Sequence, residues 1–109
     1  ARVLEANCRS IDVSARFGGD EFCVLMPHAE PDSAIRVAHR IASAFDEAMS
    51  AIVESDSLVS MSIGVSHLQI NQPVSADELV LFADEAMYQA KSISSKRVVM
   101  SEASRRNVA

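Results

Sequence analysis

The sequence is poor in cysteine, glycine and proline, and each shortage excludes a class of protein. Two cysteines, Cys8 and Cys23, are too few for a disulfide framework and lack metal-ligand spacing, so we expect reduced, buried thiols in a cytoplasmic protein. Three glycines and three prolines in 109 residues argue against a disordered or low-complexity chain. The remaining composition, 49% hydrophobic and 23% charged, is typical of one globular domain.

Positive charge and long apolar runs are also scarce. A formal net charge of -5 argues against nucleic-acid binding, because a phosphate backbone requires a basic face. Any phosphate ligand must therefore be met by a few local cations. No signal segment opens the chain and no apolar run approaches the ~20 residues that span a bilayer, so we expect no direct membrane contact here. A membrane tether of the parent protein would lie outside this sequence.

The stretch RFGGDEF, residues 16–22, is predicted to form the tip of a β-hairpin between strands at residues 10–17 and 22–26. Gly18 and Gly19 accept positive φ and let a ligand approach the backbone closely. Asp20 and Glu21 then place two carboxylates side by side, and Mg²⁺ prefers one or two carboxylates together with phosphate oxygens. This pattern indicates a site for metal-bound phosphate. The alternative from residue types alone is an ordinary turn whose acids face water.

The rest of the chain alternates helical and extended patterns. Residues 1–9 suit the end of a helix, and a long amphipathic helix is predicted to begin near Pro31 or Asp32. Residues 57–68 alternate between an apolar face and a face of small residues, as a strand does. A capping box, Ser75 and Glu78, opens a second helix over 75–92, and residues 97–100 form a last short strand.

This order of elements predicts an α+β sandwich with helices packed on a mostly antiparallel sheet. The domain is expected to cover residues 1–100, followed by a polar tail over 101–109. The segments 51–57 and 68–74 are interpreted as ordinary loops. The three histidines, His28, His39 and His67, have no ligand spacing and are interpreted as surface residues.

Three segments in register, RFGGDEF, SMSIGVS (60–66) and ADEAMYQAK (83–91), resemble the GGDEF family of diguanylate cyclases. The resemblance implies a palm-like domain, of the ferredoxin-like or nucleotidyl cyclase type, here in a truncated version. It also implies a head-to-head homodimer that condenses two GTP into cyclic di-GMP with release of pyrophosphate. Asp20 would bind Mg²⁺ (or Mn²⁺) and help deprotonate the 3'-hydroxyl, and Glu21 would support the metal. Gly18, Gly19 and Lys91 would bind substrate, although Lys91 also suits a solvated helix end.

A second motif, RSID at residues 9–12, is similar to the R-x-x-D inhibitory site of product-inhibited family members. Arg9 and Asp12 would bind cyclic di-GMP there, because a guanidinium takes phosphate oxygens or a guanine edge and a carboxylate accepts from guanine nitrogens. Arg40, on the long helix, would help to hold the same ligand. The alternative for Arg9 and Asp12 is a surface ion pair.

The sequence also departs from the family in two places. Family members begin with a strand and helices that carry another metal-binding aspartate and guanine-binding residues, and this stretch is absent. The chain is therefore expected either to be a fragment of a longer one or to receive the missing half from elsewhere, because losing a central strand exposes the sheet interior. Ser94, Ser95 and Lys96 replace the glycine, arginine and asparagine that the family tends to show, with Lys96 or Arg97 as the substitute phosphate contact.

Two main hypotheses follow for the function. The first is a cyclase domain, inactive as this fragment alone, in a longer parent that supplies the missing ligands. The second is a domain that senses cyclic di-GMP or GTP without synthesising cyclic di-GMP. A purely structural dimerisation domain is a third alternative, for which the intact acidic pair would be unexpected.

Overall fold

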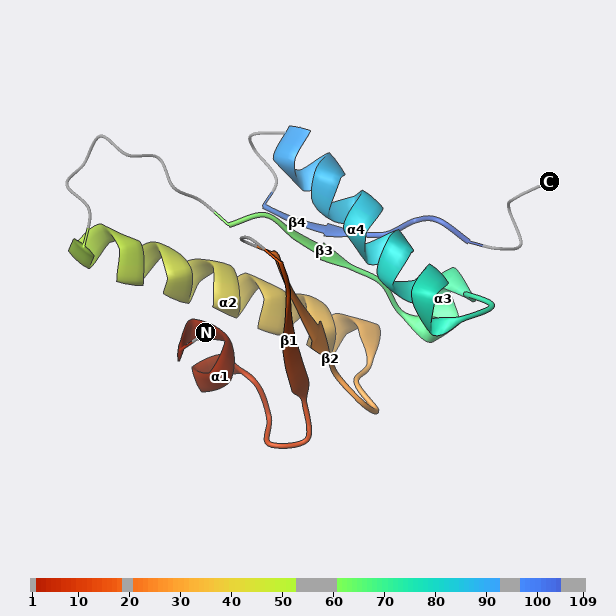
Figure 1. The fold of residues 1–109 in the computed structure, drawn as a ribbon, viewed down its shortest axis with the longest axis horizontal. Coiled ribbons are helices and arrows are strands. Elements are labelled where there is room, and N and C mark those ends of the chain that lie inside the picture. The colour runs from red at the N-terminus through yellow and green to blue at the C-terminus, as the bar shows by residue number, and fades with distance from the viewer. Residues whose placement is uncertain (1, 19–20, 53–60, 93–96, 105–109) are drawn as a thin grey trace.

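The computed structural model describes residues 2–18, 21–52, 61–92 and 97–104. The elements follow one another in the order α1 (Arg2–Asn7), β1 (Val13–Gly18), β2 (Glu21–Leu25), α2 (Pro31–Ile52), β3 (Ile63–Val65), α3 (Leu68–Asn71), α4 (Ala76–Ser92) and β4 (Val98–Met100) (Figure 1). The α+β prediction is confirmed, as are the initial helix, the hairpin and the two long helices. None of the helices in the described part of the chain is both long and apolar enough to span a membrane.

The strands form two separate pairs among the described residues, and only one of them is antiparallel. β1 pairs with β2 in an antiparallel hairpin, whereas β3 pairs with β4 in parallel. Helices α3 and α4, which lie between β3 and β4 in the chain, provide the long crossover connection that a parallel pair requires. The mostly antiparallel sheet of the sequence prediction is therefore present only at the hairpin.

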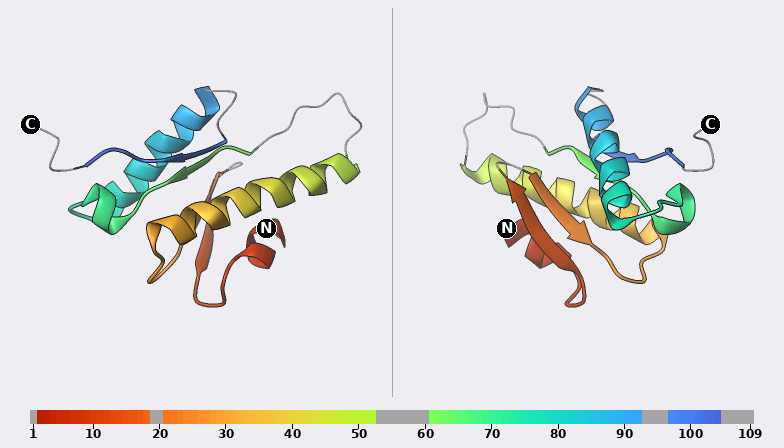
Figure 2. Two further views of the ribbon diagram at one scale, coloured as in Figure 1. Left: turned by 180° about the vertical axis from the view of Figure 1, so that it is seen from behind. Right: turned by 45° about the vertical axis from the view of Figure 1, so that its right-hand side comes forward.

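Helix α2 begins where its sequence predicts and buries its apolar stripe. Pro31 occupies the first helical position and Asp32 lies in the first turn, both of which favour a helix start. Ala38, Ile41 and Ala42 are at most 5% exposed and form the buried face of the helix. Figures 1 and 2 show α2 between α1 and the β3–β4 pair, and α2 contacts both.

Helix α4 packs across the β3–β4 pair at very short range. Ser75 accepts a hydrogen bond from the Glu78 amide, and Glu78 accepts one from the Val74 amide, one residue earlier than in a standard capping box. Phe82, Ala86 and Ala90, spaced by four residues, are buried against the strands. At Gly64 a Cβ atom would lie only 2.0 Å from the Ala83 carbonyl oxygen, so glycine is required for this approach.

The interpretation of segment 68–74 as an ordinary loop is wrong, because this segment contains helix α3. His67 caps this helix by accepting the Gln69 amide, and Asn71 is fully buried. The Asn71 amide group donates to both oxygens of Ser101 and to the Ala103 carbonyl, and its Oδ1 accepts from the His67 amide. Ser101, expected in a polar tail, is therefore buried and anchored to α3.

Candidate functional site

Glu21 is the first residue of β2, directly after the turn of the hairpin. Gly18 and Glu21 are paired residues at the tip end of the strands, and the register shifts between Arg16 and Gly18, which marks a bulge. The Glu21 side chain is partly buried. Gly19 and Asp20, both predicted site residues, lie outside the described residues.

A trough of about 740 Å³ opens between the hairpin and the β3 strand. Its two walls are residues 21–26, which include β2, and residues 61–66 around β3. Apolar residues of both long helices also line it: Ala34, Val37, Ala38 and Ile41 of α2, and Leu79, Val80, Ala83 and Met87 of α4. Within the described residues β2 pairs only with β1, and β3 only with β4. Each wall therefore presents an unpaired strand edge, as expected when a central strand is missing.

The carboxylates at this trough suit a hard cation but do not enclose one. Glu21 and Asp84 both line the trough, and carboxylate oxygens are the ligands that Mg²⁺ prefers. Among the described residues no group of three or more histidine, cysteine, aspartate or glutamate side chains is placed to hold a metal. The donor chemistry of Asp20 and Glu21 fits Mg²⁺, and further ligands have to come from phosphate oxygens or another segment.

Lys91 does not line the trough, unlike Glu21. It is exposed in the last turn of α4, where a cation favours the helix dipole, and its ammonium group lies 5.6 Å from the centroid of the Tyr88 ring. Lys91 therefore has no direct contact with the trough, and its predicted role in binding substrate stays a prediction.

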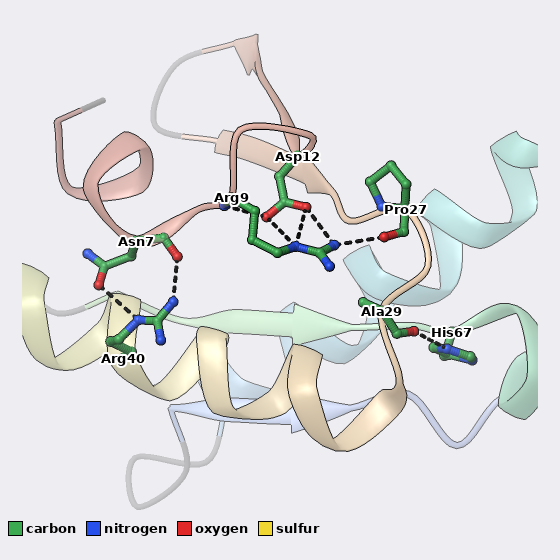
Figure 3. A network of polar contacts seen from close by, with 7 residues as sticks. All are labelled: Asn7, Arg9, Asp12, Pro27, Ala29, Arg40 and His67. Atoms are coloured by element: carbon green, nitrogen blue, oxygen red, sulfur yellow. Dashed lines mark hydrogen bonds and ion pairs between the residues drawn. The ribbon is translucent and has the colours of Figure 1, made fainter.

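The RSID motif forms a compact ionic turn. The Arg9 guanidinium contacts both carboxylate oxygens of Asp12, with the shortest distance 2.8 Å from Nη2 to Oδ1, and the Arg9 amide donates to Oδ2 at 2.8 Å (Figure 3). The Asp12 side chain is 1% exposed, whereas that of Arg9 is 43% exposed. The hydrogen bonds from Arg9 hold the pKa of Asp12 below its usual range. Asp12 is therefore an anion that fixes the direction of the Arg9 side chain.

Arg40 approaches the same segment from α2. Its Nη2 donates to the Asn7 carbonyl at 2.7 Å and its Nε to the Asn7 side-chain oxygen at 3.1 Å. The guanidinium thereby satisfies the last carbonyl of α1, one of the groups that a helix end leaves without a partner. Figure 3 shows the Arg40 guanidinium at Asn7 and the Arg9 guanidinium between Asp12 and Pro27, so the three predicted residues of this site lie around the segment 7–12.

Cys8 and Cys23 are less buried than the sequence analysis predicted. Both thiols are free and partly exposed. Desolvation raises the pKa of each thiol, so at neutral pH both stay protonated and weakly nucleophilic.

Two residues have structural roles that the sequence analysis did not predict. Arg97, considered as a substitute phosphate contact, forms an ion pair with Asp46 and donates to the Met61 carbonyl, so it ties α2 to the β3–β4 pair. His67, interpreted as a surface residue, is partly buried and its Nε2 lies 2.8 Å from the Ala29 carbonyl oxygen. No local pattern marks either residue, because the partners are 36 to 51 positions away. Lys96 lies outside the described residues.

Comparisons with known proteins agree with the fold and the motifs. The family model described as "Diguanylate cyclase, GGDEF domain" matches residues 1–97. Relatives include the Bacillus subtilis protein YhcK, 39% identical over 91% of this chain, and Diguanylate cyclase A of Treponema denticola, 32% identical over 94%. Response regulator PleD of Caulobacter vibrioides is 35% identical over 88% of the chain. The chain spans 28%, 27% and 21% of these three proteins.

Proposed function

Since the chain belongs to the GGDEF family of diguanylate cyclase domains, we propose that the complete domain condenses two GTP into cyclic di-GMP and two pyrophosphates. The observation that carries this proposal is the place of Glu21. Glu21 stands next to Asp20, which follows the two glycines in the sequence, and it lines a trough bordered by two strand edges that are unpaired among the described residues. A nucleotide can lie against the glycines there, with its phosphates close to the acidic pair.

The trough itself is filled, in this proposal, by an extended segment from outside residues 1–109. A strand laid between β2 and β3 can bond to both edges that are unpaired among the described residues, and its apolar side chains can contact the residues of α2 and α4 that line the trough. The family resemblance implies that this strand carries the additional metal-binding aspartate. Its carboxylate would complete the donor set that Asp20 and Glu21 begin.

Within that site Asp20 and Glu21 would hold Mg²⁺ or Mn²⁺, which when bound neutralises triphosphate charge. Asp20 accepts the proton of the 3'-hydroxyl of one GTP, whose oxygen then attacks the α-phosphorus of the second GTP. The bond from that phosphorus to the bridging oxygen breaks, and pyrophosphate leaves. Lys91, exposed at the end of α4, attracts the phosphates. Because each domain carries one such site, two domains must meet head to head.

The proposal is tested by incubating the full-length protein with GTP and Mg²⁺ and identifying the products. We expect cyclic di-GMP and pyrophosphate in a ratio of one to two, and no product without the metal. The isolated 109-residue chain is expected to be inactive, because its trough lacks the central strand. Turnover by the isolated chain would contradict our account of the missing ligands.

A second function, sensing of cyclic di-GMP without synthesis, is favoured by a specific observation. Asp12 and Asn7 hold Arg9 and Arg40 in fixed directions around one segment, whereas Arg97 is committed to Asp46 and to the Met61 carbonyl. A protein that binds cyclic di-GMP through Arg9 but yields no product from GTP would be assigned to this second function.

Both functions share one prediction about Arg9. Cyclic di-GMP offers two phosphates and two guanines, and charge-assisted hydrogen bonds to such groups are the strong ones. Arg9→Ala is therefore expected to weaken cyclic di-GMP binding by at least about tenfold, measured by calorimetry. Arg36→Ala is the matched control, because Arg36 is also exposed and its guanidinium donates to Ser33, three residues earlier in the same helix. Equal affinity of wild type and Arg9→Ala would leave RSID as a surface ion pair.

A further inference from the structure

The turn between β2 and α2 is held in an unfavourable backbone conformation. The Ala29 amide closes the turn on the Met26 carbonyl at 3.4 Å, a long hydrogen bond. His28, the third residue of this turn, has φ of 58°, in the left-handed region that glycine adopts without cost and that other residues adopt at an energetic cost. The imidazole is exposed, so no burial of this side chain compensates for the strain. The turn therefore depends on contacts from outside itself.

Two side chains from distant segments supply those contacts. Arg9 Nη2 donates to the Pro27 carbonyl at 2.7 Å, and His67 bonds the Ala29 carbonyl at 2.8 Å (Figure 3). His67 Nδ1 accepts the Gln69 amide at 3.0 Å, so the ring hydrogen sits on Nε2 and is donated to Ala29. The same imidazole thus holds the turn with one nitrogen and caps α3 with the other.

The clamped turn also borders the proposed catalytic trough. Pro27, His28 and Ala29 line the trough together with His67, at the end where β2 leaves the hairpin. Helix α2 starts two residues later, and the Glu30 carbonyl accepts the Ala34 amide in its first turn. A change in the turn therefore alters the wall of the trough and the start of α2 together.

We propose that the Pro27–Ala29 turn is a relay that couples the Arg9 side chain to the end of the trough and to helix α3. An anionic ligand that engages the Arg9 guanidinium competes with the Pro27 carbonyl for Nη2. Release of Pro27 lets the strained turn relax, which draws the Ala29 carbonyl away from His67 and loosens the cap of α3. The part of this proposal in which a ligand displaces Pro27 rests on the proposed binding of cyclic di-GMP by Arg9. The coupling of Arg9 to the turn and to α3 does not depend on that binding.

Amide hydrogen exchange in the full-length protein tests the coupling without ligand. Arg9→Ala is expected to raise the exchange rate of the Gln69 amide by about two- to tenfold, the scale of one lost hydrogen bond. The Leu79 amide, bonded to the Ser75 carbonyl at the start of α4, is the internal control and should not change. Unchanged exchange at Gln69, or an equal rise at Leu79, would overturn the relay.

Two further variants test the route of the coupling. His67→Asn keeps a good capping residue for α3 but is too short to reach Ala29, so adding Arg9→Ala should change Gln69 exchange no further. His28→Gly removes the strain, so Arg9→Ala should have a smaller effect in that background. Full additivity of Arg9→Ala with both variants would contradict the relay.

Addition of cyclic di-GMP to the wild type separates this inference from the proposed function. The ligand is expected to reproduce the faster Gln69 exchange of Arg9→Ala. If cyclic di-GMP fails to bind while the variants behave as expected, the ligand assignment fails and the relay stands. If it binds through Arg9 and Gln69 exchange stays constant, the relay is wrong and the binding site stands.

Discussion

Replacing Gly64 by alanine is expected to destabilise the domain by at least about 3 kcal/mol, the upper part of the range for overpacked cores. The added Cβ would lie 2.0 Å from the Ala83 carbonyl oxygen and 2.3 Å from the Met87 amide nitrogen. Both neighbours are backbone atoms of α4, so no side-chain rotation can relieve the clash. The helix would have to move off the strand, and the burial of Phe82 and Ala86 depends on that contact.

Urea unfolding of the full-length protein, followed by circular dichroism, measures this effect. Ser62→Ala is the matched control because it also introduces alanine in the β3 segment, and it should cost less than about 1 kcal/mol. A loss of less than about 1 kcal/mol for Gly64→Ala would mean that β3 and α4 are not in backbone contact. Since a domain of this kind has a total stability of only about 5–15 kcal/mol, the expected loss is large enough to reduce the soluble yield.

The elements that the sequence predicted are those with a repeated pattern. The apolar stripe that includes Ala38, Ile41 and Ala42 marked the buried face of α2 before any contact was known. The alternation of apolar and small residues over 57–68 predicted a strand, of which the described residues contain β3, Ile63–Val65. Gly64, on the face of small residues, meets α4. For these elements the period of the apolar residues and the capping residues were sufficient, because the apolar face of a helix or strand is the face that packs against the core.

The parts that could not be predicted depend on contacts between distant residues. Helix α3 has four residues, too few for a helical period, and its cap is a histidine rather than a residue that caps frequently. The parallel pairing of β3 with β4 depends on the path of the crossover. At the candidate site, Arg9 and Asp12 form the ion pair that the sequence offered as the alternative, and their binding of cyclic di-GMP stays a prediction. The Arg9–Pro27 bond spans 18 positions and has no local signature.

Asp20→Asn is expected to lower the rate of cyclic di-GMP synthesis by the full-length protein at least about 100-fold, the scale of losing a general base. Asparagine has nearly the same size as aspartate, but its amide cannot accept the proton of the 3'-hydroxyl and carries no charge for the metal. Glu21, which lines the trough, keeps its carboxylate in this variant, so part of the donor set is retained. The effect is therefore expected in kcat more than in GTP affinity.

The measurement is the initial rate of pyrophosphate release at saturating GTP and Mg²⁺, with GTP affinity determined separately by calorimetry. Asp77→Asn is the matched control, since Asp77 is an exposed acid in the first turn of α4 and its replacement removes the same charge. That control is expected to retain the wild-type rate. A wild-type rate in Asp20→Asn would falsify the assignment of Asp20. A loss of about 100-fold in kcat with GTP affinity retained is what a general base requires, because substrate still binds while proton transfer from the 3'-hydroxyl is lost.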